Sequence, residues 1–308
     1  MLINPNTSAA TTAMMTAIAR RTLGPAVTVR GVTVARGPRM LTDPAALRAA
    51  APEVLAAGRH ALTEGTCHAL LVAAFGDPGV PDLRALASAR TQADANAAAG
   101  AGVVAGAVAG VGVGDGAGAG AGVGVVAGAG AVAAAGLVAG VGGGAHAPAP
   151  AEPRVRVRTE PHDRAPDPLP VPVVGIGEAA ILEAAALGRR FGIATTTPEL
   201  AGHITERVAA LGLSGLFTGL RLTGGDPEAL SARPDALRES LARAVRACVV
   251  RDGAQAVVIG GGPLGEAAAS LHARFETPVI SPIAAACRRI TSLLGEAPGS
   301  PPFDRAAP

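Results

Sequence analysis

The stretch Leu70–Gly79 reads LLVAAFGDPG, and the stretch Val257–Gly265 reads VVIGGGPLG. In both, an apolar run breaks into a loop rich in glycine and proline. Each is followed later by an apolar strand that starts with proline and leads into an alanine-rich helix, PVVGIGEAA from Pro172 and PVISPIAAA from Pro278. This duplication predicts two similar α/β lobes. Equivalent loops should then meet at a cleft between the lobes, where ligands usually bind.

A second repeated feature is a strand that ends in a short hydroxylated loop, LINPNTSAATT from Leu2 and FGIATTTPEL from Phe191. Apolar strands alternate with helical segments through both halves, which is typical of parallel sheets covered by helices. The expected strands cover residues 2–3, 27–35, 69–74, 191–194, 219–222 and 256–260. The expected helices cover residues 8–23, 43–64, 198–211 and 236–250, and Thr7 or Ser8 should cap the first of them.

The middle of the chain has a different composition. Residues 97–144 are almost wholly Ala, Gly and Val, with Asp115 as their only charge, and a segment rich in proline and charge follows. Frequent glycine and scarce large aliphatic residues argue against a membrane span. We expect a disordered low-complexity insert at a loop tip. The expected organisation is therefore lobe 1 at 1–92, joined by a C-terminal helix at about 280–296, the insert at 93–170, lobe 2 at 171–280, and a disordered tail at 297–308.

Composition excludes several classes of function. The net charge is +2, and aromatic residues make up 2% of the chain, with no Trp or Tyr, so neither a basic nucleic-acid footprint nor a base-stacking surface is expected. The start MLINPNTS lacks the pattern of a signal peptide. The three cysteines have no motif spacing, which favours a reducing cytoplasm over a disulfide framework.

Three familiar ligand motifs are discounted. Gly175–Ala180 reads GIGEAA and matches the dinucleotide fingerprint, but no acidic residue ends the next strand, where a ribose would need one. The GGGPLG loop lacks the Lys-Ser/Thr ending of a P-loop. The six histidines show no ligand spacing, so no metal site and no cofactor are expected.

The candidate binding residues lie at the carboxyl ends of the predicted strands, where ligands of parallel sheets sit. Hydroxyls, amides and free backbone N–H groups at helix N-termini suit a carboxylate or an amide. Plain N-capping would explain one hydroxyl in each loop, but it explains less well why both halves place hydroxyls at equivalent points. The candidates are Asn6, Thr7, Ser8, Phe75, Gly76, Thr195, Thr196 and Gly262.

Five motifs in the same order resemble the hydantoin racemase branch of the aspartate/glutamate racemase superfamily. They are INPNTS at the start, FGDPG at Phe75, PVVGIGEAA at Pro172, RFGIATT at Arg190 and PVISPIAAA at Pro278. The resemblance covers most of the chain outside residues 93–170 and the tail. It implies two pseudo-symmetric lobes with a site between them. It also implies proton transfer next to a carboxylate or amide without a cofactor, with a small carboxylate or hydantoin as the ligand. Proteins of this kind are expected to form homo-oligomers.

The same resemblance implies two catalytic cysteines, which remove and return a proton from opposite faces of the substrate. One stands directly before the FGDPG loop and the other lies inside the later glycine loop. This chain has Ala74 and Gly261 at those positions. Neither side chain can move a proton, so both positions of the acid/base pair are substituted.

Other side chains are weaker candidates for proton transfer. Cys67 should lie at the far end of its strand, Cys248 near the end of a helix, and Cys287 on an apolar helix stripe typical of core packing. Asp77 and Glu178 are the titratable groups nearest the expected cleft, with Glu266 as a third. Structural roles, a turn for Asp77 and a helix start for Glu178, are favoured for both carboxylates.

Three functions therefore stay open. The leading one is an amino-acid or hydantoin racemase, an isomerase that would have to use groups other than the two thiols. The second is a lyase or hydrolase with altered chemistry, for which the superfamily's single-thiol decarboxylase is a precedent. The third is a catalytically silent protein that binds a small carboxylate. A fold alone cannot choose among them.

Overall fold

The computed structural model describes residues 1–65, 67–108 and 170–295, and it contains two four-stranded parallel sheets. The first has the order β2-β1-β3-β4 and the second β6-β5-β7-β8. The first sheet consists of β1 (Leu2–Asn4), β2 (Gly31–Thr33), β3 (Leu70–Val72) and β4 (Val173–Gly175). The second consists of β5 (Phe191–Thr195), β6 (Phe217–Leu222), β7 (Ala256–Ile259) and β8 (Val279–Ile280). The identical strand order confirms the predicted pair of pseudo-symmetric α/β lobes.

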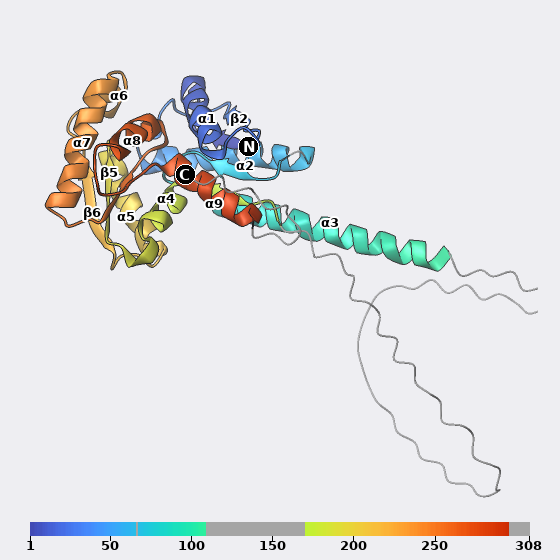
Figure 1. Cartoon of the computed structure of the whole chain (residues 1–308). Helices are drawn as coiled ribbons and strands as arrows, with labels where there is room; N and C mark the ends of the chain where they lie inside the picture. Colours follow the sequence, from blue (N-terminus) through green and yellow to red (C-terminus); the bar gives the residue numbers. More distant parts are fainter. Residues whose placement is uncertain (66, 109–169, 296–308) are drawn as a thin grey trace, which may run out of the picture. The chain divides into compact units, whose positions relative to one another are not determined.

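Helices connect successive strands within each lobe (Figure 1). Those of the first lobe are α1 (Ala9–Leu23), α2 (Pro44–Glu64) and α3 (Val80–Val108). Those of the second lobe are the 3₁₀ turn η2 (Pro198–Leu200), α5 (Ala201–Ala210), α6 (Pro227–Ser231), α7 (Pro234–Val250), the 3₁₀ turn η3 (Gly262–Leu264) and α8 (Gly265–His272). Their starts follow local signals, since Ser8 caps α1 by accepting from the N–H of Thr11, and Asp43 caps α2 before Pro44.

Two helices cross between the lobes. Helix α4 (Ile176–Ala184) follows the last strand of the first sheet, yet it packs on β7 and β8 of the second; the short turn η1 (Ala186–Gly188) ends it. Helix α9 (Pro282–Gly295) follows the last strand of the second sheet and packs against α1 and β4 of the first lobe. The largest hydrophobic cluster accordingly contains residues of both lobes, from Leu2 and Met15 to Phe191 and Cys287.

Three expected boundaries differ from those of the structure. Strand β4 pairs in register with β3, with Leu71 opposite Val174, so residues 173–175 belong to the first sheet and not to a second lobe that begins at 171. Helix α3 continues to Val108, so the residues just after 93 are helical instead of structureless. The second expected strand is also shorter than residues 27–35. The remainder of the insert, residues 109–169, and the expected tail at 297–308 lie outside the described residues.

No helix within the described ranges is both long and apolar enough to cross a membrane. The same part of the chain contains no cluster of three or more His, Cys, Asp or Glu side chains arranged to hold a metal ion.

Candidate active site

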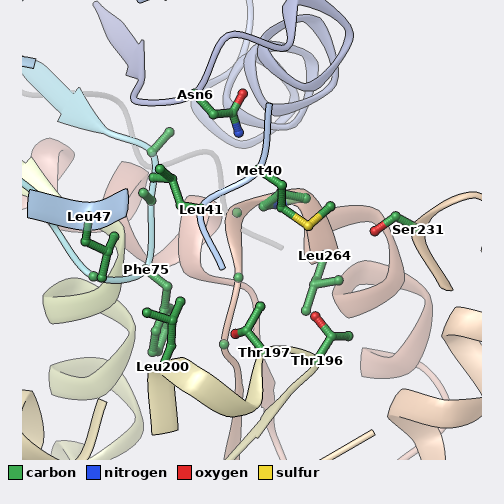
Figure 2. Close-up of a pocket in the computed structure, with 17 residues that line it drawn as sticks. Asn6, Met40, Leu41, Leu47, Phe75, Thr196, Thr197, Leu200, Ser231 and Leu264 are labelled. Carbon is green, nitrogen blue, oxygen red and sulfur yellow. The ribbon is translucent and has the colours of Figure 1, made fainter. Parts of the chain in front are cut away.

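Loops from both lobes line one pocket at the carboxyl ends of the strands (Figure 2). The lobe 1 loops follow β1, β2 and β3, and the lobe 2 loops follow β5, β6 and β7. The cavity volume is about 60 Å³, which suits a small ligand. The lining residues are Asn6, Met40, Leu41, Leu47, Ala73, Ala74, Phe75, Gly76, Thr196, Thr197, Leu200, Ser231, Gly260, Gly261, Gly262, Pro263 and Leu264.

Asn6 offers a hydrogen-bond donor to this pocket. Its Oδ1 accepts from Asn4 Nδ2 at 2.8 Å and from the N–H of Ser8 at 2.9 Å, and its own N–H donates to Asn4 Oδ1 at 3.2 Å. These bonds fix the orientation of the amide, because Oδ1 is held by two donors. The Nδ2 group of Asn6 therefore points toward the cavity, as Figure 2 shows, and the site favours a ligand with an acceptor oxygen at that point.

The second lobe contributes hydroxyls from the loop after β5. Thr195, the last residue of β5, donates from Oγ1 to the carbonyl oxygen of Gly260 at 2.7 Å, so it joins the end of β5 to the loop after β7 and does not line the pocket. Thr196 is 7% exposed and lines the pocket, and its hydroxyl makes no hydrogen bond among the described residues. Thr196 and Thr197 lie across the pocket from Asn6 (Figure 2).

Backbone donors add to these side chains. Within the described ranges, the N–H groups of Gly76 and Thr196 donate no hydrogen bond, and both residues line the pocket from opposite lobes. Free N–H groups of this kind bind anionic or carbonyl oxygens well. Other parts of the lining are apolar, because the side chains of Leu47, Phe75 and Leu200 face the pocket. The site thus combines acceptor-binding groups with room for an apolar part.

The two positions at which the family resemblance places cysteines both line the pocket. Ala74 stands in the loop after β3 and Gly261 in the loop after β7, so they come from opposite lobes. A Cβ added at Gly261 would lie 3.1 Å from Cγ and Cδ1 of Leu264, which occupies the adjoining space. None of the described lining residues has a titratable side chain. The pocket walls therefore carry no general acid or base of their own.

The candidate carboxylates Asp77 and Glu178 do not line the pocket, but form an ionic cluster behind the loop that does. The buried Asp77 carboxylate accepts from the N–H of Gly177 at 2.9 Å, from the N–H of Glu178 at 2.7 Å and from Arg207 at 3.0 Å. Glu178 also pairs with Arg207, at 2.9 Å, and with Arg84, at 2.9 Å. Desolvation by burial raises the pKa of Asp77 to about 6, and Arg207 limits the rise. Asp77 thus caps α4 and anchors the loop after β3.

The GIG sequence that resembles a dinucleotide fingerprint makes room for this anchor. A Cβ at Gly175 would lie 2.3 Å from Cγ of Asp77, and a Cβ at Gly177 would lie 2.0 Å from the carbonyl oxygen of Phe75. The glycines therefore serve the close approach of the FGDPG loop to the start of α4.

The other candidates lie away from the cavity. Thr7 and Ser8 do not line it; Thr7 faces the carbonyl of Gly37 at 3.5 Å and Ser8 caps α1. Glu266 is exposed at the start of α8.

The cysteines occupy the structural positions that the sequence suggests. Cys248 and Cys287 are fully buried, and burial raises the pKa of each thiol to about 12. Cys67 precedes β3, at the end away from Ala74, and donates to the carbonyl of Ala69. None of the three lines the pocket.

Sequence reasoning missed several lining residues. Met40 and Leu41 come from the loop after β2, and Ser231 from α6 after β6. The available signal was topological, because these loops also follow carboxyl ends of strands. His203 was missed as well; its Nε2 lies 3.4 Å from the carbonyl oxygen of Gly76, behind the pocket wall.

Comparison with known proteins agrees with this architecture. The sequence model of Asp/Glu/Hydantoin racemase matches residues 1–89 and 162–290. A hydantoin racemase of Paenarthrobacter aurescens is 31% identical over 121 residues, 39% of this chain and 51% of that protein. The match thus spans about half the length of this curated relative.

Solved structures show the same fold. An allantoin racemase from Klebsiella pneumoniae superposes with a TM-score of 0.65 at 21% identity, covering 96% of this chain and 86% of that one. An allantoin racemase from Pseudomonas fluorescens gives a TM-score of 0.63 at 19% identity, covering 95% and 88%. With two like lobes, a cleft between them and a family match over most of its length, this chain belongs to the Asp/Glu/hydantoin racemase family.

Proposed function

We propose that the cleft binds a small molecule with a carboxylate or a cyclic amide, such as an amino acid or a hydantoin, without a cofactor. The observation that carries this proposal is the Nδ2 group of Asn6, which is held toward the cavity by two bonds to its Oδ1. The hydroxyl of Thr196 and the free N–H groups of Gly76 and Thr196 supply further donors from both lobes. Such a set matches acceptor oxygens on one side of a ligand.

We further propose that the unmodified chain binds this ligand without thiol-dependent racemisation. Proton exchange next to a carboxylate or amide needs a base and an acid on opposite faces of the carbon. Ala74 and Gly261 supply neither, and no described lining residue is titratable. The racemase relatives support isomerase chemistry for the family. A racemase, lyase or hydrolase reaction in this chain would need an acid or base from a residue that does not line the pocket. The geometry therefore favours the binding function.

The three free cysteines fit a reducing compartment, and we propose the cytoplasm.

Calorimetric titration with hydantoins, allantoin and amino acids tests the binding proposal. Asn6→Asp keeps the shape of the side chain but replaces the donor by an oxygen, and it should weaken binding of a carboxylate or carbonyl ligand by tenfold or more, as about 1.4 kcal/mol corresponds to a factor of ten. Thr196→Val should have a smaller effect of the same sign. Thr7→Val is the matched control, because Thr7 lies near Asn6 but outside the pocket. An unchanged affinity in both cleft variants would refute the site.

A further inference from the structure

A second hollow lies on the second lobe, between helix α7 and the edge strand β6. Its cavity volume is about 540 Å³, and it shares no lining residue with the cleft. Ala244 and Ala247 of α7 are small residues that leave the hollow open between longer neighbours. The other lining residues are Arg221, Leu222, Thr223, Gly224, Ser240, Arg243, Arg246, Val250 and Arg251.

Four arginines line this hollow, and three of them form no ion pair among the described residues, so the hollow is positively charged. Arg221 forms an ion pair with Asp252, which is partly buried beside it. Arg243 donates to the hydroxyl of Ser240 at 2.8 Å, and within the described residues neither Arg243, Arg246 nor Arg251 pairs with a carboxylate. Arg243 and Arg246 of α7 and Arg251, just after the helix, line the same hollow, and an anion bound between them would reduce their mutual repulsion.

Apolar side chains complete the hollow. Leu222 and Val250 are 42% and 75% exposed, and they are two of the three exposed large hydrophobic residues in the described part of the chain. Both line this hollow. A ligand with an apolar or planar portion next to its anionic groups would cover them.

We propose that this hollow is a binding site for a phosphorylated small molecule with at least two phosphate groups, separate from the cleft. Guanidinium forks match phosphate oxygens in pairs, and three unpaired arginines balance two to three negative charges. Leu222 and Val250 add contacts to an organic portion of the ligand. The site is independent of the function proposed for the cleft, and the two can fail separately.

Titration of the full chain with inorganic tripolyphosphate at low ionic strength tests this site. Tripolyphosphate should bind, ATP should bind more tightly because its organic portion reaches Leu222 and Val250, and added salt should weaken both. Arg243→Gln together with Arg246→Gln should weaken binding by about tenfold or more. Arg21→Gln with Arg59→Gln is the matched control, which removes the same charge from exposed positions on lobe 1 and should change affinity less than twofold.

The proposal is overturned if tripolyphosphate does not bind, if citrate binds as tightly, if only long polyanions such as heparin bind, or if the arginine pair and its control lose affinity equally. Asn6→Asp should leave tripolyphosphate binding intact, which separates this site from the cleft.

Discussion

The two lobes have the same strand order, but they hold their equivalent loops in different ways. After β3, the loop carries Asp77, whose buried carboxylate binds the first turn of α4 and Arg207. After β7, the corresponding loop carries Leu264, which is 4% exposed and packs in the core of the second lobe. The duplication thus persists in the backbone and in the position of the pocket. One loop is anchored by a buried carboxylate, and the other by apolar packing of Leu264 and by the Thr195 hydroxyl, which donates to Gly260.

A second difference lies in the connection that follows each of these loops. In the second lobe, the short helix α8 joins β7 to β8. In the first lobe, the connection from β3 to β4 runs from Val72 to Val173 and contains α3 and the low-complexity stretch. Symmetric lobes therefore tolerate a large asymmetry in one crossover, provided that both strands still pair in the sheet.

The largest expected effect comes from restoring the symmetry of the two catalytic positions. Ala74→Cys with Gly261→Cys should raise exchange of the α-proton of a bound hydantoin or amino acid with deuterated water, since each positioned acid or base contributes about 10²–10⁴-fold. Either single change should do much less, because exchange with inversion needs groups on both faces. Mass spectrometry or NMR of the ligand measures the exchange.

The structure also limits how the second cysteine fits. Gly261 has φ of 172°, an extended conformation open to any residue, so backbone freedom does not explain this glycine. Leu264 must instead shift by a few tenths of an ångström. If the unmodified chain still exchanged the α-proton rapidly after its thiols were alkylated, that result would contradict the prediction, because groups other than thiols would then transfer the proton.

The next effect concerns the anchor that only the first lobe has. Asp77→Ala should lower the free energy of unfolding by about 3 kcal/mol, because it removes one partner of a buried ion pair and the cap of α4. Asp82→Ala removes an exposed acid from the same region and should cost less than about 1 kcal/mol. Urea unfolding of both variants measures the difference, and equal costs would show that the ionic anchor is unimportant.

The same anchor should make stability depend on pH in a way that the second loop cannot. The folded-state pKa of Asp77 is about 6, above its ordinary value of 3.8, so the folded chain binds more protons than the unfolded chain between these values. Stability due to this group is present below pH 3.8 and is lost as pH rises through 6. Wild type should therefore lose stability relative to Asp77→Asn over this interval. A constant difference between the two proteins would rule out the raised pKa.

Local signals predicted much of this fold, and long-range contacts account for what they missed. The cap at Ser8 and the Asp43-Pro44 start of α2 depend on neighbouring residues, so they were readable in the sequence. The assignment of β4 to the first sheet depends on pairing with β3, about 100 residues earlier. The surroundings of the site also depend on long-range contacts. Arg207 donates to Asp77 although the two residues are 130 positions apart in the sequence, and no periodicity indicates that contact.

The smallest expected effect tests the unequal crossovers. Residues 95–168 replaced by a Gly/Ser linker of about ten residues should leave unfolding cooperative and change its free energy by about 2 kcal/mol or less, which is the difference in loop-closure entropy. Ala87 is the last buried residue of α3 among those described, so the replaced residues contribute no described core side chain. Leu86 and Val171 pack against the same core cluster, so the chain on either side of the replaced residues is held in the same part of the core.

The matched control is the same replacement of α8 in the second lobe. Its Ala268 and Leu271 are fully buried, so its removal should abolish cooperative unfolding of the chain. Limited proteolysis should also cut first between residues 109 and 165, because segments of such composition lack the large apolar side chains that a core requires. If the first replacement were as damaging as the second, the long crossover would be part of the folded core, and the two lobes would be less alike than their sheets suggest.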